Sequence, residues 1–497
     1  MVDEARGGKT WWSRERLLAA VLLLGVLSGS IYLFLFTLPY PLARHVDTPF
    51  LDLGKITEYE WSANIQMVGG FAALFVMYYV GYRLCRRIQV SPVVLAVLFG
   101  FPALFSVILA YMYPISAADV FDYIVQSRIF AYYHANPYVA TGGDYLADPF
   151  VPYMVWRDFP SVYGPVWTFL SAIPSIAGGE SLLSSVLAFK ALVSAFVLAD
   201  GVLVYLVMRA VQPQWALAGA FAFTWNPLVL FETAGNAHND AVMMFFVLLA
   251  LYLGVKGKLC WVLPALVASI FVKFVTIVLV PVALAVLLKR SGSLRRALVV
   301  GSQSLALSGG LVALLWWPFW VGEKTLGFVG ERVDFITASP GTLLFIVLDE
   351  YLPKAEAIDA VKTSATLALG VLVLWEVWLL WRGRRDLFSS SYQVVFLYLL
   401  VACLWFQPWY LVWLVALGAL VPREGIFHRT NIFCFSAMLS YVVFYLWVKY
   451  PETFDYNNIQ SLAVAVVYFA PVGYWLWPAR AARPTAQRAG SPAPVGH

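Results

Sequence analysis

The sequence is poor in charged residues, in cysteine and in histidine. Of its 497 residues only 12% are charged and 61% are hydrophobic, and the mean hydropathy is +0.77. A water-soluble protein of this length would need far more polar surface, so the composition indicates an integral membrane protein. The four cysteines show no CxxC spacing, which argues against both a disulfide framework and a zinc site.

The net charge of +5 comes from short basic clusters between apolar runs. A nucleic-acid-binding protein gathers its lysines and arginines into one stripe or patch, and this chain does not. In membrane proteins such clusters mark the connections on the cytoplasmic side. We therefore expect the lipid bilayer as a partner and no nucleic acid.

Apolar runs predict an all-α polytopic protein with about fourteen transmembrane helices. The first run is too long for the core of a signal peptide, and no small-residue cleavage site precedes the polar stretch after it. Several runs are shorter than the ~20 residues that cross a bilayer. The expected spans are residues 17–38, 65–82, 93–111, 186–208, 215–230, 241–255, 259–272, 274–288, 297–321, 365–381, 392–405, 409–420, 432–448 and 461–477.

The basic clusters orient these helices in a cell membrane. Placing them inside puts an N-terminal segment, 1–16, and a disordered tail, 479–497, in the cytoplasm, on either side of a single transmembrane domain, 17–478. Acidic residues then collect in the external connections. The apolar run 165–177 would invert everything downstream if it crossed the bilayer, so it is predicted to be a re-entrant or interfacial helix.

The external loop 113–164, after the third span, holds the first candidate site. If Ser116 caps a short helix, Asp119, Asp122 and Tyr123 share one of its faces. Sugar transfer from a phospholipid carrier needs a base near the acceptor hydroxyl, and Asp119 suits that role. Its alternative role is that of a negative charge at a helix N-terminus. Asp122 either supports Asp119 or holds a divalent cation, Mg²⁺ or Mn²⁺, with it.

A second candidate site is the polar stretch 232–240, between two predicted spans. Burying this many polar side chains between helices is costly, which favours a functional site. The alternative is a polar hairpin exposed to water at the membrane surface. Because no second histidine stands at ligand spacing, His238 and Asn239 are expected to donate hydrogen bonds to phosphate or sugar. Asn236 and Asp240 are expected to bind substrate beside them.

Lys273 is a single charge within an apolar stretch that is too long for one span and short for two. Two half-length helices that meet near the outer interface would let its ammonium reach an anionic lipid head group. The alternative is that it snorkels to the surface. Arg332, in the next external loop, and Gln407 and Tyr410, at another outer helix junction, complete the candidates.

An ordered set of motifs in residues 114–273 resembles the GT-C superfamily of membrane glycosyltransferases. The likeness is closest to the polyprenol-phosphate-mannose-dependent α-1,6-mannosyltransferases of bacterial envelope synthesis. The motifs are Ser-Ala-Ala-Asp-Val-Phe at 116–121, Asn-Pro-Tyr at 136–138, Asp-Pro-Phe at 148–150, Trp-Arg at 156–157, Tyr-Gly-Pro at 163–165, Asn-Pro-Leu at 226–228 and Ala-His-Asn-Asp at 237–240.

The resemblance implies a GT-C fold, with an outward-facing cavity roofed by the external loop. It also implies a catalytic Asp119, a polyprenyl-phosphate-linked sugar donor and inversion at the anomeric carbon. Motif-region side chains expected to bind donor or acceptor include Arg128, Asp148, Arg157 and Tyr163. Two departures leave the sugar and the acceptor open: Asp122 stands where the pattern has serine, and Ser127 where it has glycine.

The sequence therefore predicts a glycosyltransferase that moves a sugar, expected to be mannose, onto a glycan or glycolipid at the outer face. Asp119 would deprotonate the acceptor while Lys273, Arg332 or His238 steadies the departing phosphate. The rivals are a transporter or flippase and a non-catalytic polymer-export subunit. A transporter predicts charges near the bilayer midplane or a repeated architecture. Here the acids lie in external loops, and the sequence has no evident repeat.

Overall fold

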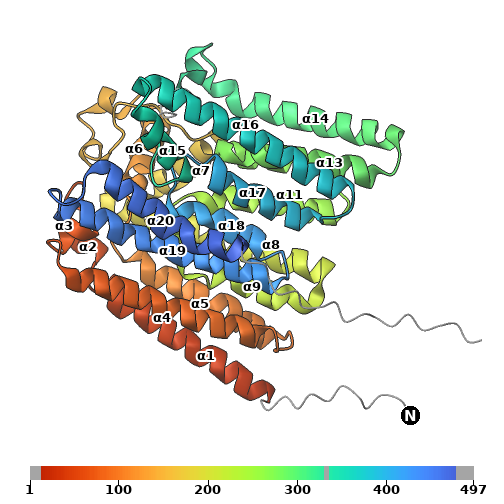
Figure 1. Ribbon diagram of the computed structural model, residues 1–497, viewed down its shortest axis with the longest axis horizontal. Coiled ribbons are helices and arrows are strands. Elements are labelled where there is room, and N and C mark those ends of the chain that lie inside the picture. The colour runs from red at the N-terminus through yellow and green to blue at the C-terminus, as the bar shows by residue number, and fades with distance from the viewer. Residues whose placement is uncertain (1–12, 330–334, 477–497) are drawn as a thin grey trace, which may run out of the picture.

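A computed structural model describes residues 13–329 and 335–476 of the chain. Within these residues it consists of helices and a few isolated β-bridges, without a sheet. The long helices lie side by side as a bundle, and several short helices gather at the end away from the start of α1 (Figure 1). The all-α prediction is confirmed.

Nine helical segments of the described residues are long and apolar enough to cross a membrane. Each overlaps one of the expected apolar runs. Two contain a short 3-10 stretch, η7 or η8, and one ends in a π-helical turn, η1. The nine are α1–η1 (Arg14–Thr37), α4 (Trp61–Cys85), α5 (Pro92–Ala110), α8 (Leu182–Val211), η7–α13 (Phe274–Ser291), α14–η8 (Leu294–Phe319), α16 (Lys354–Trp381), α19 (Glu424–Lys449) and α20 (Tyr456–Leu476).

The other five expected runs fall on shorter helices. Four are α11 (Asp240–Val255), η6–α12 (Leu259–Ile270), α17 (Leu387–Val401) and η10–α18 (Pro408–Gly418).

The fifth run, 215–230, is not the continuous helix that was predicted. It divides into α9 (Ala216–Thr224) and α10 (Pro227–Leu230), followed by a π-helical turn, η5 (Phe231–Gly235). Pro227 has no N–H to continue α9, and the Asn226 side chain accepts hydrogen bonds from two backbone N–H groups to start α10.

Short helices at one end of the bundle carry much of the connecting chain. They are α2 (Leu42–His45), α3 (Leu53–Ile56), α6 (Asp119–Ala131), α7 (Pro165–Gly178) and α15 (Pro340–Asp349). The apolar run 165–177 is helical, as expected, and α7 packs against α6 and α8. Helix α15 was not predicted.

Helix α8 runs through the protein and contacts α5, α7, α9 and α11. It carries a fully buried lysine, Lys190, whose ammonium donates to carbonyls at the end of α5 and just beyond it. The acceptors are the backbone oxygens of Leu109 and Ala110, at 3.4 and 3.2 Å, and that of Met112. Since helix-terminal carbonyls have no partner within their own helix, Lys190 caps α5 from the side.

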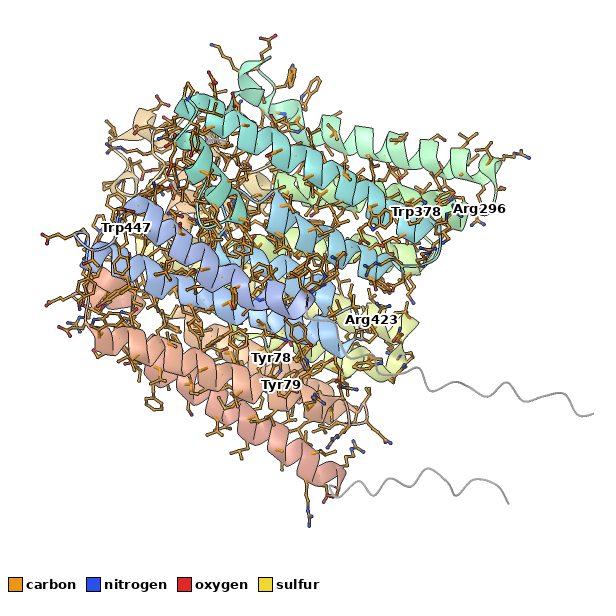
Figure 2. The ribbon with its side chains drawn as sticks, in the orientation of Figure 1. Tyr78, Tyr79, Arg296, Trp378, Arg423 and Trp447 are labelled. Carbon is orange, nitrogen blue, oxygen red and sulfur yellow. The ribbon has the colours of Figure 1, made fainter. Side chains whose placement is uncertain are left out.

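The outer surface of the long helices is apolar. Leu314 of α14, Leu374 of α16 and Phe469 of α20 are 72, 68 and 82% exposed, as expected for side chains that face lipid. Figure 2 shows Arg296 and Arg423 near one end of the bundle and Trp447 near the other. The protein is thus built as a multi-pass membrane protein, with polar and aromatic side chains toward its ends.

Candidate active site

A cavity of about 500 Å³ lies between the start of α6, the loop before α7 and the segment 398–413. Its volume falls in the roughly 300–1,000 Å³ range of small-molecule sites. Aromatic side chains dominate the wall, which suits the apolar faces of sugar rings. Its polar lining includes two of the predicted groups from the later part of the chain, Gln407 and Tyr410.

Asp119 is the first residue of α6 and lines this cavity. Its side chain is 25% exposed, so it can touch a bound molecule. The prediction that Ser116 caps the helix is wrong, because Ala118 holds the N-cap position. Ser116 Oγ instead donates to Glu232 Oε2 at 3.1 Å, since a carboxylate is the stronger acceptor.

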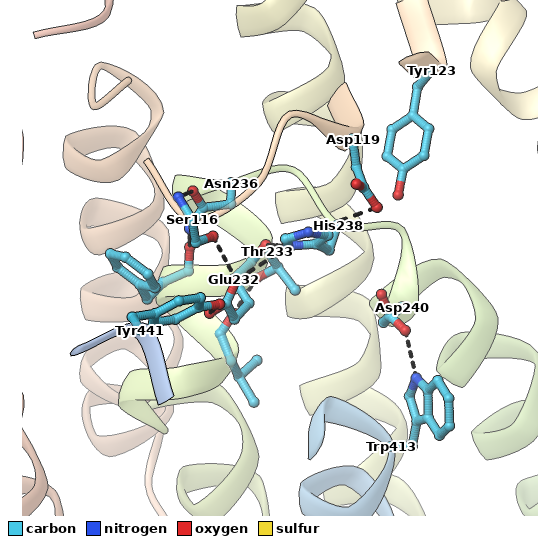
Figure 3. A network of polar contacts seen from close by, with 12 residues as sticks. Ser116, Asp119, Tyr123, Glu232, Thr233, Asn236, His238, Asp240, Trp413 and Tyr441 are labelled. Atoms are coloured by element: carbon cyan, nitrogen blue, oxygen red, sulfur yellow. Dashed lines mark hydrogen bonds and ion pairs between the residues drawn. The ribbon is translucent and has the colours of Figure 1, made fainter. Parts of the chain in front are cut away.

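His238 faces Asp119 from a turn between η5 and α11 (Figure 3). Its Nε2 lies 4.0 Å from Asp119 Oδ2, and its Nδ1 lies 3.3 Å from Glu232 Oε2 and 2.9 Å from the Glu232 carbonyl oxygen. Two acceptors beside Nδ1 require a proton there. The ring is fully buried and stacks on Trp409, with centroids 3.9 Å apart. His238 is therefore held rigidly by groups on three sides.

The electrostatics around His238 favour its charged form. Burial by itself would lower the pKa of His238, but the hydrogen bond to Glu232 and the charges of Asp119, Glu232 and Asp240 raise it above the ordinary value. Glu232 is fully buried, and its Oε1 accepts a hydrogen bond from the Tyr441 hydroxyl at 2.7 Å. A fixed carboxylate thus sits behind the histidine.

Lys273 enters the cavity from a break between α12 and η7, where its backbone is extended. The predicted break at Lys273 is present, but only the segment before it, Leu259–Ile270, is short, because Phe274–Ser291 is long enough to cross a membrane. The ammonium lies 2.8 Å from each carboxylate oxygen of Asp240, and Asp240 also accepts from the Trp413 indole N–H. Asp240 is fully buried whereas the Lys273 side chain is 15% exposed. The ion pair therefore presents its positive end to the cavity.

Asp122 lines the cavity beside Asp119 and accepts a hydrogen bond from the Trp156 backbone N–H at 2.9 Å. This contact ties the loop to α6, and whether Asp122 supports Asp119 stays a prediction. Tyr163 also lines the cavity, and Tyr123 lies buried behind it, with the two hydroxyl oxygens 3.4 Å apart. No group of three or more His, Cys, Asp or Glu side chains placed to hold a metal occurs in the described residues.

Three other predicted residues stand away from this cavity. Arg128 and Asp148 form a buried ion pair at 2.8 Å, and the Tyr133 hydroxyl donates to the same carboxylate oxygen at 2.9 Å. This pair holds the fold of the loop. Arg157 is exposed. Arg332 lies outside the described residues. Substrate binding by these residues stays a prediction.

The two predicted asparagines are buried in the turn that holds His238. Asn236 accepts from the Ser116 backbone N–H at 3.1 Å and donates to the Phe231 carbonyl at 2.8 Å. It therefore joins the loop before α6 to η5. Asn239 is fully buried at the N-cap position of α11, and its side chain makes no capping bond.

Some important residues were not singled out from the sequence. Glu232 belongs to the polar stretch that was recognised, but nothing in the spacing indicated that it contacts His238. Trp409 and Trp413 are neighbours of the predicted Gln407 and Tyr410. Their tryptophan-rich junction was a usable signal, because a Trp N–H that is buried requires an acceptor.

One protein family has a sequence model that matches residues 22–289, a little over half of the chain. Its description reads alpha-(1->6)-mannopyranosyltransferase, N-terminal domain. The matched range contains Asp119, Glu232, His238, Asp240 and Lys273. It ends before the part of the cavity wall that residues 398–413 supply.

Three individual proteins are also similar. A protein of Mycolicibacterium smegmatis named "Probable alpha-(1->6)-mannopyranosyltransferase" is 24% identical, and an alpha-(1->6)-mannopyranosyltransferase of Mycobacterium tuberculosis is 25% identical. Each match covers 63% of this chain and 63% of the relative. The alpha-(1->6)-mannopyranosyltransferase B of Corynebacterium glutamicum is 28% identical over 29% of this chain and 24% of its own length. The chain thus spans less than two thirds of each of these relatives.

Proposed function

Since the chain belongs to the α-(1→6)-mannopyranosyltransferase family, we propose that it transfers mannose from a polyprenyl-phosphate-linked donor to a glycan or glycolipid acceptor. The transfer takes place at the outer face of the membrane and inverts the anomeric carbon. One observation carries the proposal: a partly exposed carboxylate, Asp119, and an ammonium, Lys273, line the same aromatic cavity. The reaction needs these two groups, a base and a cation.

Asp119 acts as the general base. It takes the proton of an acceptor hydroxyl while the hydroxyl oxygen forms a bond to the anomeric carbon of the donor. The bond between that carbon and the phosphate oxygen breaks, and the phosphate leaves with the electron pair. Attack on the face opposite the leaving group inverts the configuration.

Lys273 stabilises the leaving phosphate. An ammonium has three N–H donors, and the two oxygens of Asp240 account for two of them. The third is available to a phosphate oxygen in the cavity. Lys273 is also the one Lys, Arg or His side chain among the described residues that line the cavity. Of the two described cations that the sequence offered, Lys273 and His238, only Lys273 lines the cavity.

His238 positions Asp119 in this proposal and does not bind the phosphate. It is fully buried and does not line the cavity, but its Nε2 faces the Asp119 carboxylate. A positive imidazolium there attracts the Asp119 carboxylate and holds it in one orientation. Glu232 in turn holds the imidazole. The order Glu232, His238, Asp119 resembles the base-and-orienter arrangement found in many active sites.

We also propose a GT-C fold of about fourteen spans, with the cavity at the outer end. Arg296 and Arg423 lie near one end of the bundle, and α6 lies at the other (Figures 1 and 2). The positive-inside rule assigns the arginine-bearing end to the cytoplasm, which supports an outer position for Asp119. The five short helical runs would then span with the help of the long helices around them.

The test is transfer by the purified protein. Polyprenyl-phosphate-mannose and a short α-1,6-oligomannoside are incubated with wild-type and Asp119→Asn protein, with and without a chelator. We expect a lengthened product from the wild type and none from the variant, whose folding is checked by size-exclusion chromatography and thermal melting. Wild-type turnover by Asp119→Asn would rule out the assigned base. A wild type inactive with mannose and every other polyprenyl-linked sugar would favour a transporter or flippase.

A further inference from the structure

A second, smaller cavity lies beside the active-site cavity. It measures about 200 Å³ and is enclosed by α3, α4, α19 and residues 115–116. One water needs ~10–15 Å³ of such space, so the cavity has room for a molecule much larger than a few waters. Its polar lining consists of Asp52, Asn64, Ser116 and three tyrosines, Tyr59, Tyr441 and Tyr445.

Asn64 is the feature that indicates a ligand. It lies on α4, one of the helices long enough to cross a membrane, and only 2% of it is exposed. Neither its amide oxygen nor its amide nitrogen has a hydrogen-bond partner in the protein. Leaving such a group buried and unpaired is costly, and buried polar groups are nearly always satisfied. A molecule that occupies the cavity can supply both missing bonds.

The charges around the cavity exclude a phosphate. No Lys, Arg or His is among the residues that line it, all of which are described, and the single ionisable acid of the lining is Asp52. Two lysines lie at the rim, but both are engaged. Lys55 pairs with Asp52 at 3.7 Å, and Lys449 donates to the Tyr445 hydroxyl at 3.1 Å. The active-site cavity, by contrast, presents Lys273.

The remaining groups suit an uncharged, hydroxyl-rich ring. An amide and tyrosine hydroxyls bond sugar hydroxyls, and aromatic faces pack against the sugar C–H groups. The rings of Tyr59 and Tyr445 lie 5.6 Å apart at one wall. An apolar lipid chain would leave Asn64 unsatisfied, so the cavity favours a sugar over an alkyl or prenyl chain.

The two cavities meet at the active site. Ser116 lines both, and its hydroxyl donates to Glu232. Tyr441 lines the second cavity and donates to the other oxygen of Glu232. Glu232 holds His238, which faces Asp119. A molecule in the second cavity would therefore touch two of the residues that hydrogen-bond to Glu232, which holds His238.

We propose that the second cavity binds a neutral sugar unit of the acceptor glycan, while the donor phosphate occupies the cavity of Lys273. This inference rests on the proposed function, because it divides that reaction's two substrates between the two cavities. Asn64 supplies hydrogen bonds to the acceptor sugar and takes no part in the chemical step.

The test separates acceptor binding from donor binding. Asn64→Leu removes the amide at similar volume, and Val448→Trp places a large ring at the rim, where Val448 is 52% exposed. For Asn64→Leu we expect the KM for a short α-1,6-oligomannoside to rise about tenfold, the size of two ordinary hydrogen bonds lost. For Val448→Trp we expect the same KM to rise because the ring blocks the cavity. The kcat and the KM for polyprenyl-phosphate-mannose should stay within twofold of wild type.

Ser304→Ala is the matched control. Ser304 is also buried in a long apolar helix, α14, with a hydroxyl that has no partner, but it lines neither cavity. Its substitution should leave both KM values unchanged. An unchanged acceptor KM in Asn64→Leu and Val448→Trp, or a raised donor KM in place of it, overturns the proposal. If Asn64→Leu folds poorly, Val448→Trp decides, because its position is exposed on the surface of α19.

A binding measurement distinguishes this proposal from the proposed function. Equilibrium dialysis of tritiated α-1,6-mannobiose against the detergent-solubilised protein needs no turnover. If the wild type transfers no sugar, the proposed function fails. Mannobiose binding that is about tenfold weaker in Asn64→Leu and unaffected by millimolar inorganic phosphate would still support a sugar site. Equal binding by wild type and both variants, or no binding by the wild type, overturns it.

Discussion

Replacing Glu232 by glutamine is expected to slow the reaction without changing the shape of the site. Glu232 is fully buried and accepts hydrogen bonds from Ser116, Tyr441 and His238. Glutamine keeps the volume and one acceptor oxygen but removes the negative charge beside His238 Nδ1. The change therefore isolates the electrostatic support of the histidine from the packing around it.

The size of the effect follows from the bond that is weakened. A hydrogen bond to a charged partner contributes about 1.5–3 kcal/mol, which corresponds to a ~10- to 150-fold change in rate if the bond supports the transition state. We expect kcat to fall within this range. The KM for the donor should change little, because neither Glu232 nor His238 lines the active-site cavity.

The pH dependence of kcat gives a second, independent readout. Glu232 raises the pKa of His238, so Glu232→Gln should lower it. In the proposed mechanism the charged imidazolium supports Asp119, and activity is lost as the pH rises through the His238 pKa. The alkaline limb of the profile should therefore move to lower pH in Glu232→Gln.

Two further variants make the prediction refutable. Tyr441→Phe removes a neutral donor from Glu232 but leaves its charge, so it should shift the limb much less. Glu376→Gln removes another buried carboxylate, in α16, which lies 3.4 Å from Arg385 and lines neither cavity. A wild-type alkaline limb in Glu232→Gln, or an equal rate loss in Glu376→Gln, would refute the role given to Glu232.

Three other outcomes are expected. Lys273→Met should reduce kcat at least 100-fold in the mannose-transfer assay, and Lys273→Arg should restore part of it because it keeps the charge. A wild-type kcat in Lys273→Met would remove Lys273 from the mechanism. Arg128→Met should lower the thermal melting temperature strongly, because breaking a buried ion pair costs about 3–5 kcal/mol, whereas the exposed Arg157→Met should hardly change it. Gly164→Ala should lower both stability and kcat. An added Cβ would lie 2.5 Å from the backbone of Phe271, two residues before Lys273. A wild-type melting curve and rate would contradict this.

The helices were largely predictable because bilayer thickness sets the length of a spanning apolar run. Nine of the fourteen expected runs coincide with long helices. The run 215–230 was misjudged because hydropathy measures composition, whereas Asn226 and Pro227 break the helix through their hydrogen bonding. Helix α15 went unseen because ten residues are too few to register as a span.

The sequence identified most polar residues of the candidate site, but it did not indicate which of them contact one another. The sequence marked Asp119, His238, Asp240 and Lys273, since polar side chains are conspicuous in an apolar chain. It could not indicate that Asp240 pairs with Lys273, because 33 residues separate them. Asn64 was passed over for a related reason: one amide in a long helix is ordinary until the space beside it is known.

If the proposed function holds, the buried Lys190 has a consequence for the lipid donors that the protein can use. By capping the last carbonyls of α5, it fixes where that helix stops and where the chain toward Asp119 begins. In the proposed mechanism, the base Asp119 would thereby be held at one depth relative to the bilayer. A phosphate head group that stands higher or lower in the membrane would present its sugar out of line with Asp119. Lys190, which is fully buried, would in this way favour donors whose phosphate head group lies at the depth of Asp119.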